Sequence, residues 1–312
     1  MMTAPPLHHC NRAAFDALFA ELSNWGRWGA EDELGTLNHL TQDVVARAVA
    51  AVRVGRTVSL AHDLDPHPGP DNTKPALHYM SQLSDIHATE PRANMDFIGT
   101  DFHGKSVTHL DALCHCNYLG RLYNGVDSAA TVSSAGGAFG SVMTTASGVV
   151  GRGVLLDIAL HRGIDWLEPG TGLGATELER VAIDAGITLR PGDIVLVRTG
   201  HRQRRNVLGS WNPSNFSAGL LPDAMRFLAA ASVAVLGGDG DSDCRPSPVP
   251  GVDSPIHALA LGAMGMPLID NMNLEQLAVT CAELQTWQFL FTMAPLRIPG
   301  GTGSPVNPLA IF

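Results

Sequence analysis

Residues 103–115 read HGKSVTHLDALCH, and this stretch carries the strongest pattern in the chain. In an extended segment residues i and i+2 point to the same face, so His109 and Asp111 can offer an imidazole and a carboxylate to one divalent ion. His115 follows one short turn later and can reach the same site as a ligand or as a base. The alternative is that these polar side chains only satisfy local hydrogen bonds. The stretch therefore predicts a metal centre whose remaining partners lie elsewhere in the chain.

Two later stretches can supply those partners. GGDGDSD at 237–243 follows a predicted strand, and strand ends in α/β sheets commonly hold ligands. It offers three carboxylates, although an ordinary acidic turn is the favoured interpretation of Asp241. Further along, His257 is expected at the start of a helix, and Asp270 just before a helix capped by Asn273.

The rest of the chain predicts an α/β protein. Its 312 residues are 45% hydrophobic and 16% charged, and a chain of this length buries a core without needing disulfides. Strands and helices mix without a strict βαβ period, which predicts a single α/β domain with mixed β-sheets and flanking helices. The expected strands are 56–62, 154–158, 193–198, 233–236 and 287–293, and the expected helices are 12–24, 41–52, 176–185, 222–231 and 273–284.

Charge and composition exclude some classes of binding partner. The net charge of −10 argues against nucleic acid, whose phosphates need a basic face. No apolar run approaches the roughly 20 residues that span a bilayer, and the first residues lack a signal-peptide pattern, so no membrane partner is expected. Five cysteines without a secretory signal predict reduced thiols and a cytoplasmic location.

Several ordered motifs resemble the family named “putative cyclase”, which contains bacterial kynurenine formamidases and isatin hydrolases. The family signature is H-x-G-T-H-x-D-x-P-x-H, and 105–115 is the matching stretch here. Further matches are 192–200, 236–239, His257 with 270–271, 294–307, and the opening 27–38, which is typical of the longer members. The resemblance covers nearly the whole chain and implies a cyclase-like, swivelling β/β/α fold.

The resemblance also implies a metal-dependent hydrolase and assigns residues to it. It places metal ligands at His109 and Asp111, and further metal or substrate contacts at His257 and Asp270. It gives His115 a proton-transfer or second-metal role. On this basis residues 56–312 are expected to form the hydrolase domain, with residues 1–55 as an N-terminal helical segment packed on the core.

The chain departs from the family pattern at three positions. Lys105 stands where the first ligand histidine is expected, and an ammonium group has no free lone pair for a metal. His103 is the nearest substitute, and with His109 and Asp111 it would form an open three-ligand site. Asp270 replaces the usual glutamate and reaches one methylene less, which argues against a full second metal site. Leu113 replaces the signature proline and affects only backbone shape.

The expected chemistry is hydrolysis by a metal-activated water. A bound Mn²⁺ or Zn²⁺ lowers the pKa of its water toward about 7 and polarises a carbonyl group. His115 is the expected base, and His257 with the metal is expected to stabilise the oxyanion. The favoured small-molecule substrates are a cyclic amide, a cyclic imide or an aryl formamide. The alternatives are a lactone opened at the same site, and a catalytically impaired homologue that only binds metal or ligand.

Substrate contacts are harder to assign from the sequence. Trp28, Phe102 and Tyr123 can line an apolar pocket for a ring substrate, with core packing as the alternative. Arg198 can bind a substrate carboxylate, with a structural salt bridge as the alternative. Specificity is expected to lie in loops such as 63–100 and 202–218. The resemblance further implies a homodimer or homotetramer.

Overall fold

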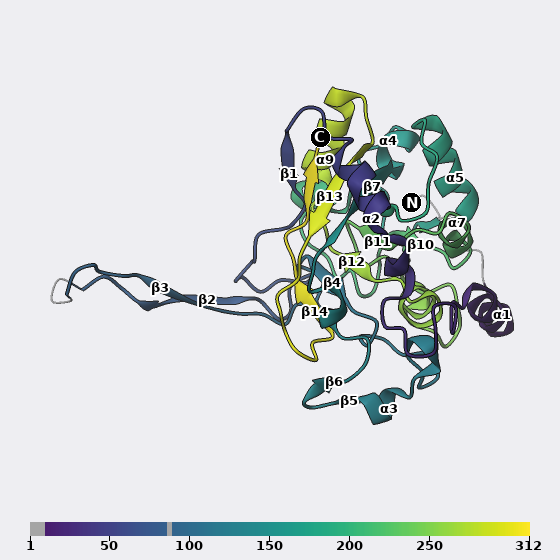
Figure 1. Cartoon of the computed structure of the whole chain (residues 1–312). Coiled ribbons are helices and arrows are strands. Elements are labelled where there is room, and N and C mark those ends of the chain that lie inside the picture. Colours follow the sequence, from purple (N-terminus) through teal and green to yellow (C-terminus); the bar gives the residue numbers. More distant parts are fainter. Residues whose placement is uncertain (1–9, 86–88) are drawn as a thin grey trace.

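A nine-stranded mixed sheet forms the framework of the molecule (Figure 1). The computed structural model describes residues 10–85 and 89–312. The strand order is β1-β15-β13-β7-β9-β11-β12-β4-β14, with β7, β9, β11 and β12 parallel and the others antiparallel to their neighbours. The strands are β1 (Thr57–Ser59), β4 (His109–Asp111), β7 (Val149–Asp157), β9 (Ile194–Arg198), β11 (Val235–Gly238), β12 (Leu268–Asp270), β13 (Gln288–Met293), β14 (Gly303–Pro305) and β15 (Leu309–Ile311).

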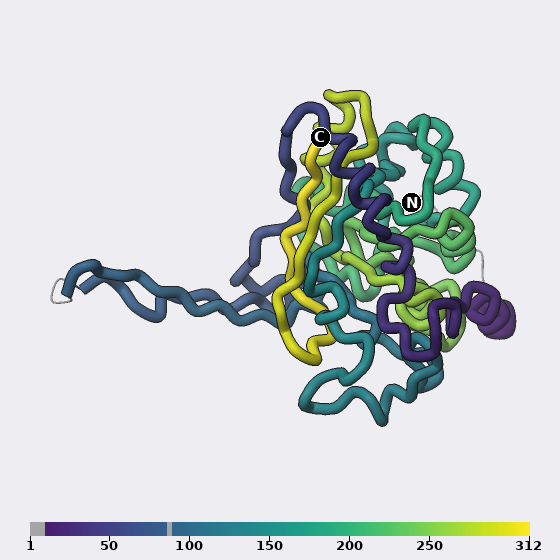
Figure 2. The backbone as a smooth tube through the Cα atoms, in the orientation of Figure 1, coloured from purple at the N-terminus to yellow at the C-terminus, as the bar shows by residue number. Residues whose placement is uncertain are grey.

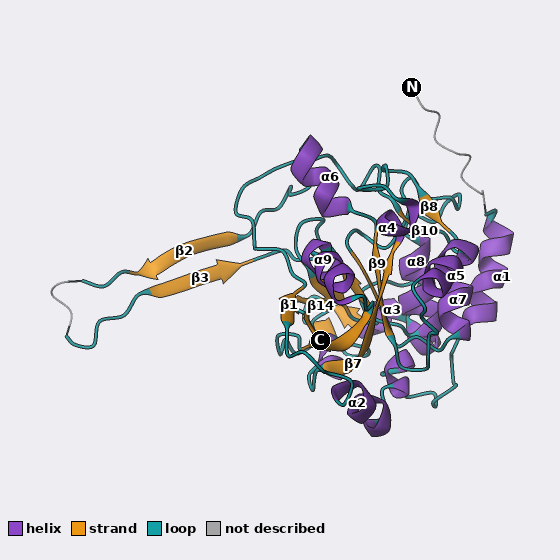
Figure 3. Ribbon diagram, turned by 90° about the horizontal axis from the view of Figure 1, so that it is seen from above, coloured by secondary structure: helices purple, strands orange, loops and turns teal. Residues whose placement is uncertain are grey.

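The apolar run of β9 shows how the sequence builds two cores around this sheet. All five residues of β9 are buried, as expected for a parallel strand covered on both faces. Ile194 and Leu196 join the core that contains α9, whereas Val195 and Val197 join the core beneath α1, α5 and α7. Figure 3 shows these helices on the two sides of the sheet. The alternation of neighbouring side chains thus places helices on both faces.

The helices follow the predicted periodicity, with differences at their starts. The helical elements are α1 (Arg12–Leu22), η1 (Gly35–His39), α2 (Gln42–Val49), η2 (Tyr123–Gly125), α3 (Ser128–Thr131), η3 (Val142–Thr145), α4 (Ile158–Arg162), α5 (Ala175–Asp184), α6 (His201–Leu208), α7 (Ala224–Ala230), α8 (Pro255–His257), the π-helix η4 (Ala258–Met264) and α9 (Glu275–Leu284). Thr41 caps α2 as predicted, because its side chain accepts a hydrogen bond from the Val44 amide. The predicted Asn273 cap is wrong: α9 begins at Glu275, and the backbone N–H of Asn273 donates to the Leu60 carbonyl.

A long hairpin projects from this body (Figure 2). It pairs β2 (Leu77–Gln82) with β3 (Met95–Gly99) in antiparallel register, within the 63–100 segment that was expected to be a loop. All six residues of β2 are exposed. The other expected loop, 202–218, is also partly regular, because its first residues belong to α6. Two short pairs, β8 (Gly172–Leu173) with β10 (Gly219–Leu220) and β5 (Val132–Ser133) with β6 (Gly136–Gly137), complete the strands described.

The predicted single α/β domain with a mixed sheet and flanking helices is confirmed. The N-terminal helices pack directly on the body, α1 against η4 and α2 against β7. Within the residues described, every helix is too short or too polar to cross a membrane.

Candidate metal centre

Strand β4 brings the central residues of the site together. It lies between β12 and β14, and His109 is paired in the ladder with Asp270 of β12. His109 and Asp111 project to one side, while Leu110 between them is fully buried in a hydrophobic core. The predicted extended segment with both side chains on one face is therefore what the structure contains.

A glycine on the neighbouring strand leaves room for the segment before β4. A Cβ at Gly303 would lie 2.8 Å from His103 Cε1 and 3.1 Å from Phe102 Cε2. Both separations are shorter than normal carbon–carbon contacts, so any larger residue would push this segment away. Gly303 therefore allows His103 to reach the β4 side chains.

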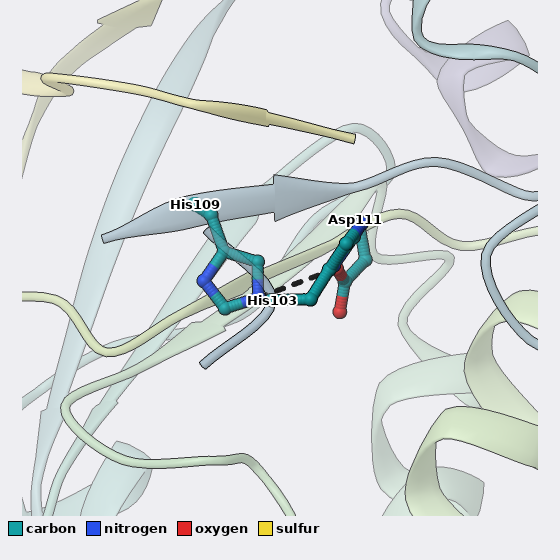
Figure 4. A group of neighbouring side chains, drawn as sticks. All are labelled: His103, His109 and Asp111. Atoms are coloured by element: carbon teal, nitrogen blue, oxygen red, sulfur yellow. Dashed lines mark ion pairs between the residues drawn. The ribbon is translucent and has the colours of Figure 1, made fainter. Parts of the chain in front are cut away.

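His103, His109 and Asp111 form a compact group of nitrogen and oxygen donors (Figure 4). His103 Nδ1 lies 2.8 Å and His109 Nε2 lies 3.4 Å from the same carboxylate oxygen, Asp111 Oδ1. The other nitrogen of each ring is already engaged, His109 Nδ1 with the Val107 carbonyl at 2.8 Å and His103 Nε2 with the Thr302 hydroxyl at 2.9 Å. Such contacts fix the ring orientation and leave the inward nitrogen free for a metal.

The inward-facing atoms of this group lack hydrogen-bond partners. Both oxygens of Asp111 and Nδ1 of His103 are buried, and none of them makes a hydrogen bond of normal geometry. A buried carboxylate without partners is costly unless a cation compensates it. Two imidazoles and one carboxylate are also a donor set that Zn²⁺ and Mn²⁺ accept. The residues present therefore fit a divalent ion.

His115 lies against this group with its ring face. It stacks on His103 with the ring centroids 3.8 Å apart and the planes within 9°, and its Nε2 lies 3.9 Å from Asp111 Oδ1. Burial lowers the pKa of His115 to about 4, although the nearby Asp111 charge opposes the shift. The ring is consequently neutral at pH 7 and has a lone pair available to accept a proton.

His257 joins the centre from α8. Its Nδ1 lies 2.6 Å from Asp243 Oδ2, and its Nε2 lies 3.4 Å from Asp111 Oδ2 and from Asp270 Oδ2. Burial alone would lower the pKa of this imidazole, but the adjacent carboxylates of Asp111, Asp243 and Asp270 raise it well above its usual value. The prediction that His257 and Asp270 lie near the β4 motif agrees with this geometry.

Asp241 is a buried member of the same cluster, which corrects its interpretation as an ordinary acidic turn. Its Oδ2 lies 2.5 Å from Lys105 Nζ and 2.7 Å from Arg245 Nε, and its Oδ1 lies 3.9 Å from His257 Nε2. Burial raises the pKa of this carboxyl, but the charges of Lys105, His257 and Arg245 bring it down to about 2. Asp241 is therefore a buried anion with two permanent cations beside it.

Sequence reasoning offered Asp243 only as one of the three carboxylates of the 237–243 loop, without a role, and it missed Arg245. Asp243 orients His257 through a hydrogen bond. Arg245 pairs with Asp241, and no metal-binding motif includes an arginine at that position. The alternation of aspartates at 239, 241 and 243 is the only sequence signal that could have indicated Asp243.

Phe102 packs against the histidines of the centre, and its role in substrate binding stays a prediction. Its ring centroid is 4.5 Å from that of His103 and 6.3 Å from that of His109. A cavity of about 250 Å³ opens beside His103, its lining is mainly polar, and Phe102 does not line it. The lining residues are Pro70, Asp71, Asn72, Thr73, Lys74, Asp101, His103, Gly104, Lys105, Ser106, Asn212 and Ser214.

Trp28 and Tyr123 have contacts of a different kind. Trp28 packs edge-on against His39. Tyr123 is completely buried, and its hydroxyl donates to Asp32 at 3.2 Å. The structure does not bring either ring into the cavity beside His103. Tyr123 belongs to the hydrophobic core, whereas Trp28 is half-buried and contacts His39 and Arg27.

Arg198 is engaged in a buried ion-pair network. Its guanidinium lies 2.8 Å from Asp157 and 2.5 Å from Glu275. These two carboxylates use its hydrogen-bonding capacity, so the structure favours the salt-bridge alternative over a substrate contact.

Comparison with known proteins identifies the family. Residues 41–242 match the family described as “Putative cyclase”. The chain therefore belongs to this family, and the resemblance seen in the sequence is confirmed. None of the curated proteins gives a significant match.

Solved structures agree with this assignment. A crystal structure described as a novel cyclase is 29% identical, with a TM-score of 0.84, and the match covers 94% of this chain and 99% of that chain. An isatin hydrolase bound to the product analogue thioisatinate is 19% identical, with a TM-score of 0.59 and coverage of 88% and 97%. Isatin hydrolase A from Labrenzia aggregata, bound to benzyl benzoate, is 23% identical, with a TM-score of 0.58 and coverage of 88% and 98%. The last two similarities establish a shared fold.

Proposed function

We propose that this protein is a metal-dependent hydrolase that opens a C–N bond in a cyclic amide, a cyclic imide or an aryl formamide. The observation that carries the proposal is the buried Asp111 carboxylate, which has no hydrogen-bond partner and whose Oδ1 faces the inward nitrogens of His103 and His109. These three residues would hold one divalent ion, Mn²⁺ or Zn²⁺, which ligand type alone does not distinguish.

The proposed chemistry divides between the ion and the chain. When bound, the ion would supply Lewis acidity toward a carbonyl group and acidify a water molecule. His115 accepts the proton of the attacking water, because its ring stacks on His103 beside the proposed ligands and its Nε2 lies 3.9 Å from Asp111 Oδ1. His257, whose ring is oriented by Asp243, donates an N–H hydrogen bond to the developing oxyanion. It takes no part in proton transfer. His115 then delivers its proton to the leaving nitrogen.

The substrate class rests on the family and on the cavity. Two solved structures of similar fold are isatin hydrolases, one of them with a product analogue bound. The cavity beside His103 is large enough for a small ring compound and lined by polar groups that can orient its heteroatoms. A lactone can be opened by the same residues, and a homodimer or homotetramer stays a prediction from the family.

A matched substrate panel tests the proposal. Protein stripped with a chelator should be inactive on a cyclic imide, an aryl formamide and the corresponding lactone, and reloading with Mn²⁺ or Zn²⁺ should restore hydrolysis of the C–N substrates. His115→Gln should retain the metal but lose about a hundredfold or more in kcat, as expected for removal of a general base. Faster hydrolysis of the lactone would favour the alternative substrate class.

A catalytically impaired binding protein is the competing hypothesis, and Lys105 motivates it. Lys105 is paired with Asp241 and leaves the His103, His109 and Asp111 group intact, which supports an active enzyme. Absence of hydrolysis by metal-replete protein, together with tight ligand binding that survives His115→Ala, would contradict our proposal.

A further inference from the structure

Two potential ligand groups share the centre, but their charges differ. The first contains His103, His109 and Asp111, and the second contains Asp241, His257 and Asp270. Asp111 of the first group forms ion pairs with histidines alone among the residues described. The second group instead adjoins permanent cations.

Both cations, Lys105 and Arg245, form ion pairs with the same oxygen of Asp241. Its Oδ2 receives the Lys105 ammonium at 2.5 Å and the Arg245 guanidinium at 2.7 Å, and all three side chains are largely buried. Only Oδ1 remains directed toward His257 Nε2, at 3.9 Å. A divalent ion bound at Oδ1 would thus sit within a few ångströms of two positive charges in a poorly solvated site, where repulsion is weakly screened.

The remaining donors of the second group are also partly engaged. Asp270 Oδ1 accepts a 2.6 Å hydrogen bond from the Ser242 hydroxyl, and His257 Nδ1 is fixed by Asp243. The charge of Asp241 is balanced by Lys105 and Arg245 without any metal, and Asp270 Oδ2 lies 3.4 Å from His257 Nε2. In contrast, the charge of Asp111 has no permanent cation beside it.

We propose that the Lys105 ammonium, supported by Arg245, takes the place of a second metal ion in this chain, so that the chain binds one divalent ion at His103, His109 and Asp111. This inference rests on the metal centre of the proposed function. Lys105 is a positioning residue in this account: it neutralises Asp241 and thereby sets the number of ions.

Counting bound ions tests this inference independently of activity. Native mass spectrometry of the folded full chain, titrated with Mn²⁺ and with Zn²⁺, should give one ion for the wild type at saturation. Lys105→Met removes the charge but keeps the aliphatic stem, and it should bind two ions, the second at least tenfold more tightly than any second ion on the wild type. Inductively coupled plasma mass spectrometry of the same samples should give the same number of metal ions per chain.

Matched variants separate the charge of Lys105 from other effects. Lys105→Arg keeps the positive charge and should remain at one ion. Lys74→Met changes the other lysine, which is exposed and paired with Asp101, and it should also remain at one ion. Lys105→Gln, which retains a donor toward Asp241, should bind two ions and provides a second test should Lys105→Met fold poorly.

The outcomes distinguish this inference from the proposed function. Two ions on the wild type, or one ion on both Lys105→Met and Lys105→Gln, would overturn the inference while leaving a hydrolase possible. No ion on the wild type would remove the metal centre itself and with it the proposed function.

Discussion

The body and the projecting hairpin are built from strands of opposite character. In the body, β9 and β11 bury every residue, and the loop after β11 carries Asp241 and Asp243 of the site. In the hairpin, every residue of β2 and most of β3 are exposed, including Tyr79 and Phe97, whose rings stack 5.0 Å apart. The strands of the body are therefore stabilised by burial, whereas those of the hairpin are exposed to solvent.

This difference shows which region contributes most to the free energy of unfolding. Buried strands are stabilised by apolar area and by polar groups that must be satisfied, so changes there are costly. An exposed two-stranded ribbon gains little from either source and is marginal by itself. Substitutions of matched chemistry should therefore have large effects in the body and small effects in the hairpin.

The largest contrast is expected between two aspartates. Asp239 is buried and accepts hydrogen bonds from the amides of Thr199, Gly200 and His201 at 2.8–3.0 Å. Asp239→Ala leaves these donors unsatisfied and should lower the free energy of unfolding by about 3–5 kcal/mol. Asp96→Ala in the hairpin, where Asp96 makes a half-exposed pair with His78, should change it by less than about 0.5 kcal/mol. Urea denaturation measures both, and similar losses would contradict the comparison.

An intermediate effect is expected from two partly buried histidines at low pH. Burial lowers the pKa of His62 to about 3 and that of His201 to about 4, whereas in the unfolded chain both have the ordinary value near 6.5. Between these values only the unfolded chain binds the protons, so stability falls as the pH falls below about 6.5. Each histidine should cost about 1–2 kcal/mol between pH 7 and pH 5.

Denaturation of metal-free protein at several pH values checks this sign. His62→Gln should flatten the acid loss relative to the wild type, because one buried group no longer resists protonation. His78→Gln in the exposed hairpin should leave the pH dependence unchanged. A steeper acid loss in His62→Gln would contradict the explanation.

The smallest effect is expected in the hairpin itself. Tyr79 and Phe97 are 55% and 44% exposed, so the double change Tyr79→Ser, Phe97→Ser should lower the free energy of unfolding by less than about 1.5 kcal/mol. Denaturation at two protein concentrations measures this. A loss above that value that also depends on concentration would show that another subunit covers the hairpin, and the comparison would fail.

The body was predictable from sequence for a physical reason. A continuous apolar run such as 194–197 is stable only when both faces of the strand are buried. The N-cap residues Asn11 and Thr41 indicated where α1 and α2 begin. The hairpin at 77–99 was missed because its apolar residues face solvent, so it lacks the alternation of a half-buried strand.

The centre was predictable only in part. The i, i+2 spacing of His109 and Asp111 is a local property of a strand, and it placed both side chains correctly. The pairing of Lys105 with Asp241 depends on two segments that are 136 residues apart, and no local spacing encodes it. Burial likewise reversed the interpretation of Asp241, because an acidic loop reads the same in sequence whether it is exposed or covered.

Bound metal in ligand variants tests the central claim most directly. Wild-type protein, His109→Ala and Asp111→Ala should be purified, loaded with Mn²⁺ or Zn²⁺, passed through gel filtration and measured by plasma mass spectrometry, with Asp101→Ala as a control on the exposed surface. The account predicts one ion per chain in the wild type and in Asp101→Ala, and almost none in His109→Ala and Asp111→Ala. Full metal in both ligand variants would contradict it.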